Sequence, residues 1–312
     1  SYTKDIFTLF EEKVILAQGE IISTNMVTNY LCEQGVKATL IPALEFMRTD
    51  KNSEPDLTYI REKLAIQLEA NPDYEIYITQ GFICRNAYGE IDNLQRGGSD
   101  YTASLIGAAV NASEIQIWTD IDGMHDNDPR IVDKTYPVRQ LHFEEAAELA
   151  YFGAKILHPT CVQPAKYANI PVRLLNTMEP TAPGTLISNE TEKGKIKAVA
   201  AKDNITAIKI KSSRMLLAHG FLRKVFEIFE SYQTAIDMVC TSEVGVSMSI
   251  DNTKHLNEIV DDLKKYGTVT VDHDMCIVCV VGDLEWENVG FEAKALDAMR
   301  DIPRWPDRKS VV

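Results

Sequence analysis

The residues best suited to chemistry lie in one short segment, residues 94–102, which reads Leu-Gln-Arg-Gly-Gly-Ser-Asp-Tyr-Thr. Its two glycines precede a predicted helix, so backbone N–H groups there can approach an anion without a side chain in the way. Arg96 adds a planar guanidinium suited to a carboxylate or a phosphate. Asp100 could orient a lysine or simply cap the helix. Taken alone, such a loop is more often an ordinary helix start than an active site. Whether it forms part of an active site therefore has to be judged together with the other polar segments of the chain.

A second polar segment follows a predicted buried strand. Residues 117–123 read Ile-Trp-Thr-Asp-Ile-Asp-Gly, and Asp128-Pro129-Arg130 come soon after. In open α/β sheets, ligands bind beyond the carboxyl ends of strands, where this loop is expected to lie. The alternative is an Asp-Gly turn followed by an Asp-Pro turn, with no ligand.

Two further residues are candidates because of their positions at predicted helix ends. Lys155 follows Gly153 at the end of a helix, where it could cap carbonyl groups or reach a nucleotide phosphate. His158, which precedes a proline, is expected to be packed rather than catalytic. Glu20 follows Gly19 at the predicted start of a helix, where a carboxylate either suits the helix dipole or binds an amine.

The elements that must position these residues alternate between strand and helix through the first ~190 residues, which predicts an open, mostly parallel sheet with helices on both faces. Helices are expected at residues 20–34, 56–71, 101–112 and 143–153, and strands at residues 36–41, 74–80, 114–119 and 171–175. This α/β arrangement would bring strand ends and helix starts together at one edge of the sheet.

A change of composition predicts the domain boundary. Residues 176–195 are poor in large apolar side chains and contain two prolines and a polar run, so we expect domains at 1–190 and 196–312. After the boundary, strands are expected at 205–210, 235–241, 245–250 and 269–271, and helices at 219–232 and 253–265. That βαββαβ order predicts an α+β, ferredoxin-like domain with one antiparallel sheet backed by two helices.

Composition excludes several classes of function. The net charge of −14 leaves no basic stripe for nucleic acid. No apolar run reaches the ~18 residues that a membrane span needs, and the first residues lack the pattern of a signal peptide, so a cytoplasmic location is expected. Cys276 and Cys279 have the spacing of a redox or zinc motif, but on a strand they would face opposite sides. They are expected to be core residues, with no metal site.

The segments just described resemble the aspartate kinase family. The matching pieces are Gly19-Glu20, residues 96–102, residues 118–120, residues 128–130, residues 145–148 and residues 152–159. Each piece is weak alone, but together they follow the order of the family over nearly the whole chain. The resemblance implies the amino-acid-kinase fold and transfer of the γ-phosphate of ATP, bound with Mg²⁺, to the β-carboxylate of L-aspartate. The product would be 4-phospho-L-aspartate, in the first step of lysine, threonine and methionine biosynthesis.

The resemblance also implies a role for each candidate residue. Glu20 would bind the aspartate amine, Arg96 and Ser99 would bind its carboxylates, and Asp100 would orient a catalytic lysine. The nucleotide site would be formed by Thr119, Asp120, Arg130 and Lys155. Positioning and charge neutralisation are nearly all that phosphoryl transfer requires of a protein.

Residues 196–312 resemble the regulatory ACT domains of the same family, with one unit at about 205–272 and a second, incomplete unit split around it. The implied effector site consists of Met215, Gly220, Phe221, Leu222, Asp237, Ser242 and Glu243. The effector would be lysine or threonine, and the two acidic residues favour lysine. The charge-free run at 244–250 is expected to be an edge strand that pairs with a second copy, giving a homodimer. The alternative is a helix cap and a polar loop without a ligand.

Three departures from the family pattern limit these expectations. The sequence contains no Lys-Phe-Gly-Gly segment, which in the family carries the lysine that bridges the phosphates, so the chain by itself is expected to be inactive. Gln95 stands where the family often has glycine. Residues 304–312 do not continue the second ACT unit. Rival interpretations are another amino-acid kinase, a non-catalytic effector-binding protein with a kinase remnant, and a purely structural fragment.

Overall fold

The computed structural model describes residues 8–95, 97–152, 157–190, 192–212, 219–282 and 290–300. The chain forms two compact units, the first comprising Ser1–Ala198 with Val281–Asp283 and the second Val199–Val280 with Leu284–Val312. Three of the predicted site residues, Arg96, Lys155 and Met215, lie outside the described residues. No described helix is both long enough and apolar enough to cross a membrane.

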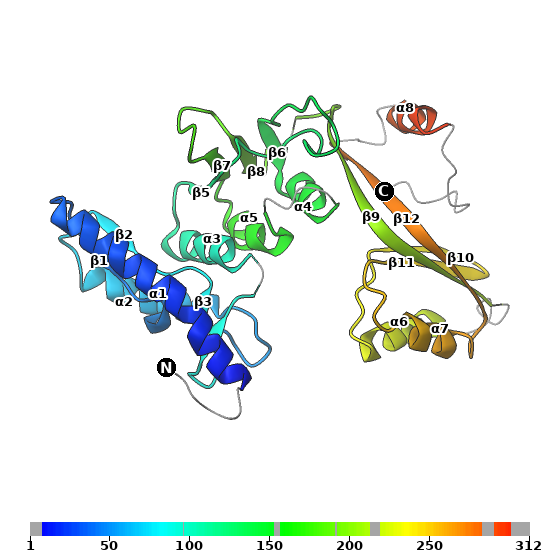
Figure 1. Cartoon of the computed structure of the whole chain (residues 1–312), viewed down its shortest axis with the longest axis horizontal. Helices are drawn as coiled ribbons and strands as arrows, with labels where there is room; N and C mark the ends of the chain where they lie inside the picture. The colour runs from blue at the N-terminus through cyan, green and yellow to red at the C-terminus, as the bar shows by residue number, and fades with distance from the viewer. Residues whose placement is uncertain are drawn as a thin grey trace. The chain divides into compact units, whose positions relative to one another are not determined.

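The first unit alternates helices and strands, as predicted, and they can be followed in Figure 1. Its helices are α1 (Leu9–Glu33), η1 (Ala43–Glu45), α2 (Leu57–Glu69), α3 (Gly98–Val110), α4 (Phe143–Phe152), η2 (Pro159–Val162) and α5 (Gln163–Ala168). Its strands are β1 (Ala38–Leu40), β2 (Ile76–Ile78), β3 (Ile83–Arg85), β4 (Ile91–Asn93), β5 (Ile115–Thr119), β6 (Gln140–His142), β7 (Val172–Asn176) and β8 (Thr185–Ser188). The strands are short, with three to five residues each.

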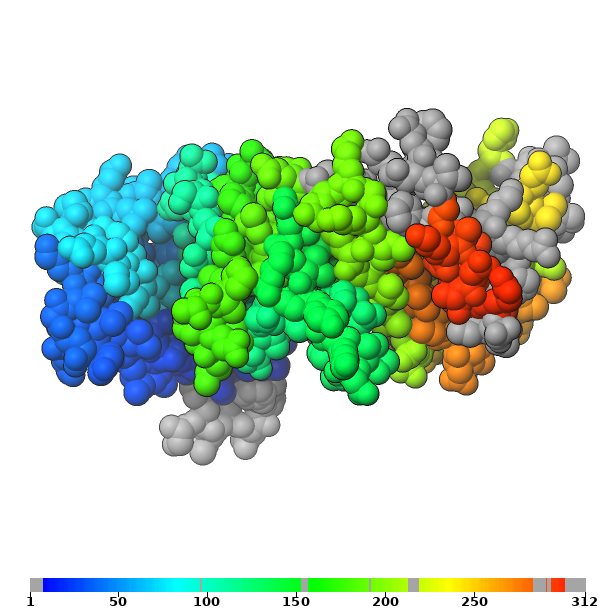
Figure 2. All heavy atoms as spheres, turned by 90° about the horizontal axis from the view of Figure 1, so that it is seen from above, coloured from blue at the N-terminus to red at the C-terminus, as the bar shows by residue number. Residues whose placement is uncertain are grey.

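The strands of the first unit pair in three separate groups. β1 and β2 form a parallel pair, β3 and β4 form a hairpin, and β5, β7, β8 and β6 form a mixed sheet in that order. In the mixed sheet, β5–β7 and β6–β8 are parallel, whereas β7–β8 is antiparallel. Helix α3 connects the earlier and later elements of this unit, because it packs against both α2 and α5, and the course of the chain can be followed by colour in Figures 1 and 2.

Helix α1 begins eleven residues earlier than the sequence pattern predicts, at Leu9 instead of Glu20. Its start is a capping box, in which Thr8 and Glu11 each bind the other's backbone N–H. Gly19 lies inside the helix, and a Cβ there would have no atom within 4 Å. The interpretation of Glu20 as a helix-opening acid is therefore wrong, since Glu20 lies in the middle of α1, away from the positive end of the helix dipole.

The second unit has the predicted βαββαβ order. Its elements are β9 (Ile196–Lys211), α6 (Phe221–Ser231), β10 (Met238–Ser242), β11 (Gly245–Ile250), α7 (Leu256–Leu263) and β12 (Thr268–Gly282), followed by α8 (Phe291–Ala298). The strand order is β10-β11-β9-β12, the order of a ferredoxin-like sheet. Buried residues of β9 and β11 pack against Val225 and Phe229 of α6 and Ile259 and Leu263 of α7.

The predicted edge strand at residues 244–250 is wrong. β11 lies inside the sheet, because its residues pair with β10 on one side and with β9 on the other. Every residue of β11 is buried, which explains its lack of charge without any partner chain. The edges of this sheet are β10 and β12.

One smaller expectation needs correction, and one segment needs a finer description. The segment at 176–195, in which the sequence predicts the domain boundary, contains β8, whose Ile187 is fully buried in the mixed sheet of the first unit. Cys276 and Cys279 both lie on β12, but Cys276 is exposed rather than buried in a core. The reason is that β12 is an edge strand, and sequence pattern alone does not distinguish an apolar edge strand from a central one.

Candidate functional site

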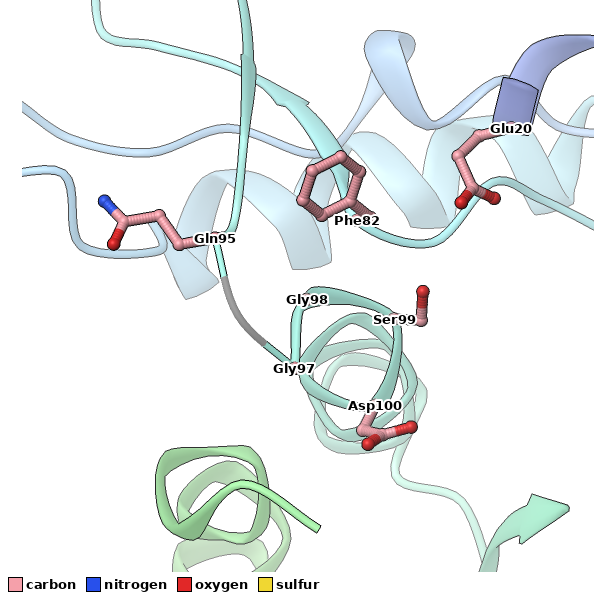
Figure 3. Close-up of a pocket in the computed structure, with 7 residues that line it drawn as sticks. All are labelled: Glu20, Phe82, Gln95, Gly97, Gly98, Ser99 and Asp100. Atoms are coloured by element: carbon pink, nitrogen blue, oxygen red, sulfur yellow. The ribbon is translucent and has the colours of Figure 1, made fainter. Parts of the chain in front are cut away.

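A pocket of about 300 Å³ opens where α1 faces the start of α3 in the first unit. It is lined by Glu20, Phe82, Gln95, Gly97, Gly98, Ser99 and Asp100. Figure 3 shows the Glu20 carboxylate and the Ser99 hydroxyl pointing toward each other beside the Phe82 ring. Asp100 points away from Glu20, on another side of the first turn of α3. Three predicted residues from two separate segments, Glu20 from one and Ser99 and Asp100 from the other, are thus brought to one pocket.

The glycines of the loop permit contacts that no side chain would allow. Gly97 has a φ of 74°, and a Cβ there would lie 2.7 Å from the Cβ of His158 and 2.9 Å from the Sγ of Cys161. A Cβ on Gly98 would lie 2.8 Å from the Phe82 ring. Distances this short are not tolerated, so both glycines are required for the close packing of this loop. The loop is held from behind by the thiol of Cys161, which donates to the Gly97 carbonyl over 3.1 Å.

The start of α3 offers hydrogen-bond donors to the pocket. The N–H groups of the first helical residues have no partner within an α-helix, and the helix dipole favours an anion beside them. Gly97, in the left-handed conformation, is the N-cap and has no side chain to occupy these donors. The N–H of Gly98 already donates to the Gln95 carbonyl over 3.1 Å, so a carboxylate next to Ser99 would meet the N–H groups that follow Gly98 in the first turn, together with a hydroxyl.

Asp100 lies in a setting that disfavours its charge. Its carboxyl group is half-buried, and burial raises its pKa above the ordinary value. No ion pair with Asp100 is found among the residues that the structure describes. A cation brought beside Asp100 would reverse this shift, which suits a residue that orients a lysine.

Two residues with side chains adopt the left-handed conformation at the pocket. Phe82 has a φ of 68° and Gln95 a φ of 58°. Such angles cost about 1–2 kcal/mol for a residue with a side chain. Gln95 therefore has the backbone geometry that glycine prefers, at the position where the family often has glycine.

Thr119, Asp120 and Arg130, the predicted nucleotide-side residues within the described part of the chain, do not line this pocket. Thr119 ends β5, and its hydroxyl bonds both the N–H and the C=O of Ile121, which makes a tight turn at the end of the strand. Asp120 is exposed at this strand end. The Arg130 guanidinium is also exposed and binds Asp128, with 2.9 Å between Nε and Oδ1. This pairing lowers the pKa of Asp128 and raises that of Arg130.

The predicted effector residues occupy several environments in the second unit. Gly220 is the left-handed N-cap of α6, Phe221 is buried in the core, and Leu222 is partly exposed. The Ser242 hydroxyl donates to the Gly245 carbonyl, and Glu243 is exposed in the turn between β10 and β11.

Asp237, expected to receive the amine of an effector, already binds an amine of the chain itself. Its Oδ1 lies 2.9 Å from the Nζ of Lys202, and its side chain is only 1% exposed. Asp251 binds the same ammonium group over 3.0 Å.

Sequence reasoning missed Phe82 as a pocket residue. The available signal was the run Thr79-Gln80-Gly81-Phe82, where polar residues follow the apolar strand β2. The same argument, applied to the end of β5, identified Thr119 and Asp120.

Comparison with known proteins agrees with this fold. Residues 3–176 match the amino acid kinase family. The chain is 37% identical to aspartokinase 1 of Arabidopsis thaliana over 91% of its own length and 53% of that protein. It is 35% identical to the lysine-sensitive aspartokinase 3 of Escherichia coli, over 86% of its own length and 63% of that protein. The chain thus spans little more than half the length of such relatives.

Solved structures give the same result. The chain resembles E. coli aspartokinase III in complex with aspartate and ADP, with a TM-score of 0.82 and 32% identity, over 95% of this chain and 69% of that one. The complex of the same enzyme with lysine and aspartate gives a TM-score of 0.75 and 34% identity, over 94% of this chain and 68% of that one. The chain therefore belongs to the amino acid kinase family, and within that family to the aspartokinases.

Proposed function

We propose that the pocket between α1 and α3 binds L-aspartate in an aspartate kinase, which transfers the γ-phosphate of ATP to the β-carboxylate and forms 4-phospho-L-aspartate. The observation that carries the proposal is the convergence of Glu20 with Ser99 and the start of α3 in one pocket. An acid facing a set of N–H and hydroxyl donors matches a ligand with an amine at one end and carboxylates at the other. The E. coli relative was solved with aspartate and ADP, which supports this choice of ligands.

Each pocket residue then has a defined task. Glu20 binds the ammonium group of aspartate, and Ser99, with the N–H groups at the start of α3, binds a carboxylate. Arg96 supplies the guanidinium for the carboxylates. Held in this way, the β-carboxylate is presented to the phosphate in one orientation, which is the main contribution a protein makes to phosphoryl transfer.

Asp100 orients the cation that phosphoryl transfer requires. The burial that raises its pKa makes an adjacent ammonium group favourable. These 312 residues contain no Lys-Phe-Gly-Gly segment. By themselves they therefore bind aspartate but do not turn it over, and turnover needs such a lysine to be supplied.

The nucleotide is assigned to the segments after β5 and after α4. Thr119, Asp120, Arg130 and Lys155 bind ATP, whose Mg²⁺ arrives as part of the substrate. The exposure of Asp120 and of the Arg130 guanidinium supports this role, because both groups are accessible to a ligand. Lysine, threonine and methionine biosynthesis is the pathway in which this activity would act.

The second unit is proposed to be an ACT domain that regulates the kinase by binding an amino acid, with lysine as the effector. Its ferredoxin-like strand order and the lysine-bound E. coli relative support this proposal. The residues that would contact lysine are Gly220 and Leu222 at the start of α6, Ser242 at the end of β10 and Glu243 in the turn before β11. Met215, which lies outside the described residues, would join them. A homodimer remains part of the proposal, with β10 or β12 as the available sheet edge.

Calorimetric titration of the chain with L-aspartate tests the proposed function. Glu20→Gln removes the charge that binds the amine, so we expect aspartate affinity to fall at least about tenfold. The matched control is Glu33→Gln, an exposed acid on the same helix and outside the pocket, which should bind like the unaltered chain. Equal affinity in the Glu20→Gln variant and the unaltered chain would refute the assignment of the pocket.

A further inference from the structure

Glu20 stands in the middle of the long helix α1. Apolar contacts hold this part of α1 to the core, since Ala17 is 1% exposed and Ile21 packs against the same buried cluster. The Glu20 side chain itself is only half-buried, so the rotation of α1 about its axis decides whether the Glu20 carboxylate faces Ser99. A polar contact near Glu20 adds a directional constraint on that rotation.

The contact comes from Gln80, just beyond the end of β2. Its side chain is 2% exposed, and its Nε2 donates to the Thr24 Oγ1 over 2.8 Å. Its Oε1 accepts from the backbone N–H of Ala43 over 2.7 Å. The Thr24 hydroxyl in turn donates to the backbone carbonyl of Glu20 over 2.7 Å. The chain of hydrogen bonds thus runs from β2 to the backbone of Glu20.

The two residues that follow Gln80 contact the other side of the pocket. Gly81 packs so closely on α3 that a Cβ would lie 3.0 Å from the Cα, Cβ and Oγ of Ser99. The N–H of Phe82 donates to the Thr102 Oγ1 over 3.1 Å, and that hydroxyl donates to the Gly98 carbonyl over 2.7 Å. One short segment, residues 80–82, therefore contacts both walls of the pocket.

We propose that Gln80 is a positioning residue, which through Thr24 sets where the Glu20 carboxylate stands relative to Ser99 and so sets the preference of the pocket for a ligand with an amine. Gln80 does not line the pocket, so its effect on the ligand is indirect and passes through its hydrogen bond to Thr24 of α1. A purely structural glutamine would affect stability alone, or weaken every ligand equally. A positioning glutamine affects the amine end of the ligand selectively.

This inference rests on the proposed function, because it takes aspartate as the ligand. It is tested by the ratio of the affinities for L-aspartate and for succinate, which is aspartate without its amine. The unaltered chain should prefer aspartate. Gln80→Leu should lower that preference about tenfold, the value of one hydrogen bond to a charged group, while succinate binding changes little.

A second set of variants covers the case in which the leucine variant does not fold. Thr24→Val removes the hydroxyl that Gln80 binds and keeps the branched shape, so it should also lower the preference for aspartate over succinate. Thr24→Ser keeps the hydroxyl and should therefore keep that preference. Thr28→Val is the matched control. It lies one turn further along α1, and its hydroxyl binds only the Thr24 carbonyl, so the preference should not change.

The outcomes separate the two proposals. A folded Thr24→Val variant that keeps the full preference for aspartate would overturn the role of Gln80 and leave the proposed function standing. An unaltered chain that binds aspartate no better than succinate would contradict the amine site of the proposed function, and the role of Gln80 would fall with it.

Discussion

At the scale of single residues, the pocket brings together several groups whose conformation or charge is unfavourable for folding. Asp100 is half-buried with its pKa raised, and Phe82 and Gln95 hold left-handed backbone angles. Such features reduce stability and persist where the surrounding packing determines them. Their concentration around one pocket is typical of a functional site.

Asp100→Asn should stabilise the chain at neutral pH. The folded pKa of Asp100 is raised, so as pH rises past the ordinary value of about 3.8 the unfolded chain ionises first, and folding loses free energy until the folded carboxyl group also ionises. The variant lacks this penalty. Its melting temperature should exceed that of the unaltered chain at pH 7, and the two should converge below pH 3.8.

Asp128→Asn serves as a control that should change the melting temperature in the opposite direction. Arg130 lowers the pKa of Asp128, so this carboxylate contributes stability above its ordinary pKa, and the contribution is lost as pH falls through the lowered value. Its removal should lower the melting temperature at pH 7. If Asp100→Asn lowered the melting temperature at pH 7, as Asp128→Asn should, the electrostatic account of Asp100 would be wrong.

Gln95→Gly should increase the free energy of unfolding by up to about 1 kcal/mol. Glycine adopts the φ of 58° without strain, although the greater freedom of glycine in the unfolded chain offsets part of the gain. Urea denaturation measures the difference, with Gln95→Ala as a control that retains the strain. A glycine variant less stable than the alanine variant would contradict it.

At the scale of elements, much of the fold could be predicted, and the failures have physical causes. The bounds of α2, α4 and β11 follow from local periodicity, and the structure confirms them closely. The start of α1 was missed because Gly19 resembles a helix boundary, although Thr8 and Glu11 carry the capping-box pattern. Non-local pairings could not be predicted: the interior place of β11 depends on β9, and the contact of Gln80 with Thr24 spans 56 residues.

Lys197→Met should destabilise the first unit by about 3 kcal/mol. Lys197, in β9, binds Glu145 of α4 over 2.7 Å, and the two side chains are only 4% and 9% exposed. Removing one partner leaves the other charge buried without compensation. The double variant Lys197→Met with Glu145→Gln should recover much of the loss.

The matched control for this pair is Lys195→Met. Lys195 pairs with Glu192 over 3.5 Å, but both side chains are largely exposed, so its removal should cost less than about 1 kcal/mol. Denaturant titration of the three variants gives the comparison. Equal losses for the Lys195 and Lys197 variants would show that burial does not govern the pair.

At the scale of the whole molecule, the chain joins a unit with a candidate substrate pocket to a unit with a ferredoxin-like sheet. β9 belongs to both, since it begins in the first unit and supplies a central strand of the second. An effector that stabilises the second unit therefore acts on a strand whose first residues are anchored to α4. In the proposed regulation, a change in the second unit would reach the first unit through the continuous backbone of β9.

Lysine should raise the melting temperature of the chain more than threonine does, because Glu243, one of the residues proposed to contact lysine, is exposed and carries a negative charge. A ligand present at 100 times its Kd adds about 2.7 kcal/mol of stability. Glu243→Gln should reduce the effect of lysine, whereas Glu230→Gln, an exposed acid of α6, should not. A chain whose melting is indifferent to both amino acids would argue against the effector site.

The central claim is that aspartate binds between α1 and the start of α3, and amide NMR of the chain titrated with L-aspartate tests it most directly. The account predicts that the largest shifts fall on Glu20, Phe82, Ser99 and Asp100, with the second unit unaffected. In the Glu20→Gln variant these shifts should require a much higher concentration of aspartate. Shifts confined to residues outside the pocket, or saturation of the variant at the same concentration as the unaltered chain, would contradict the claim.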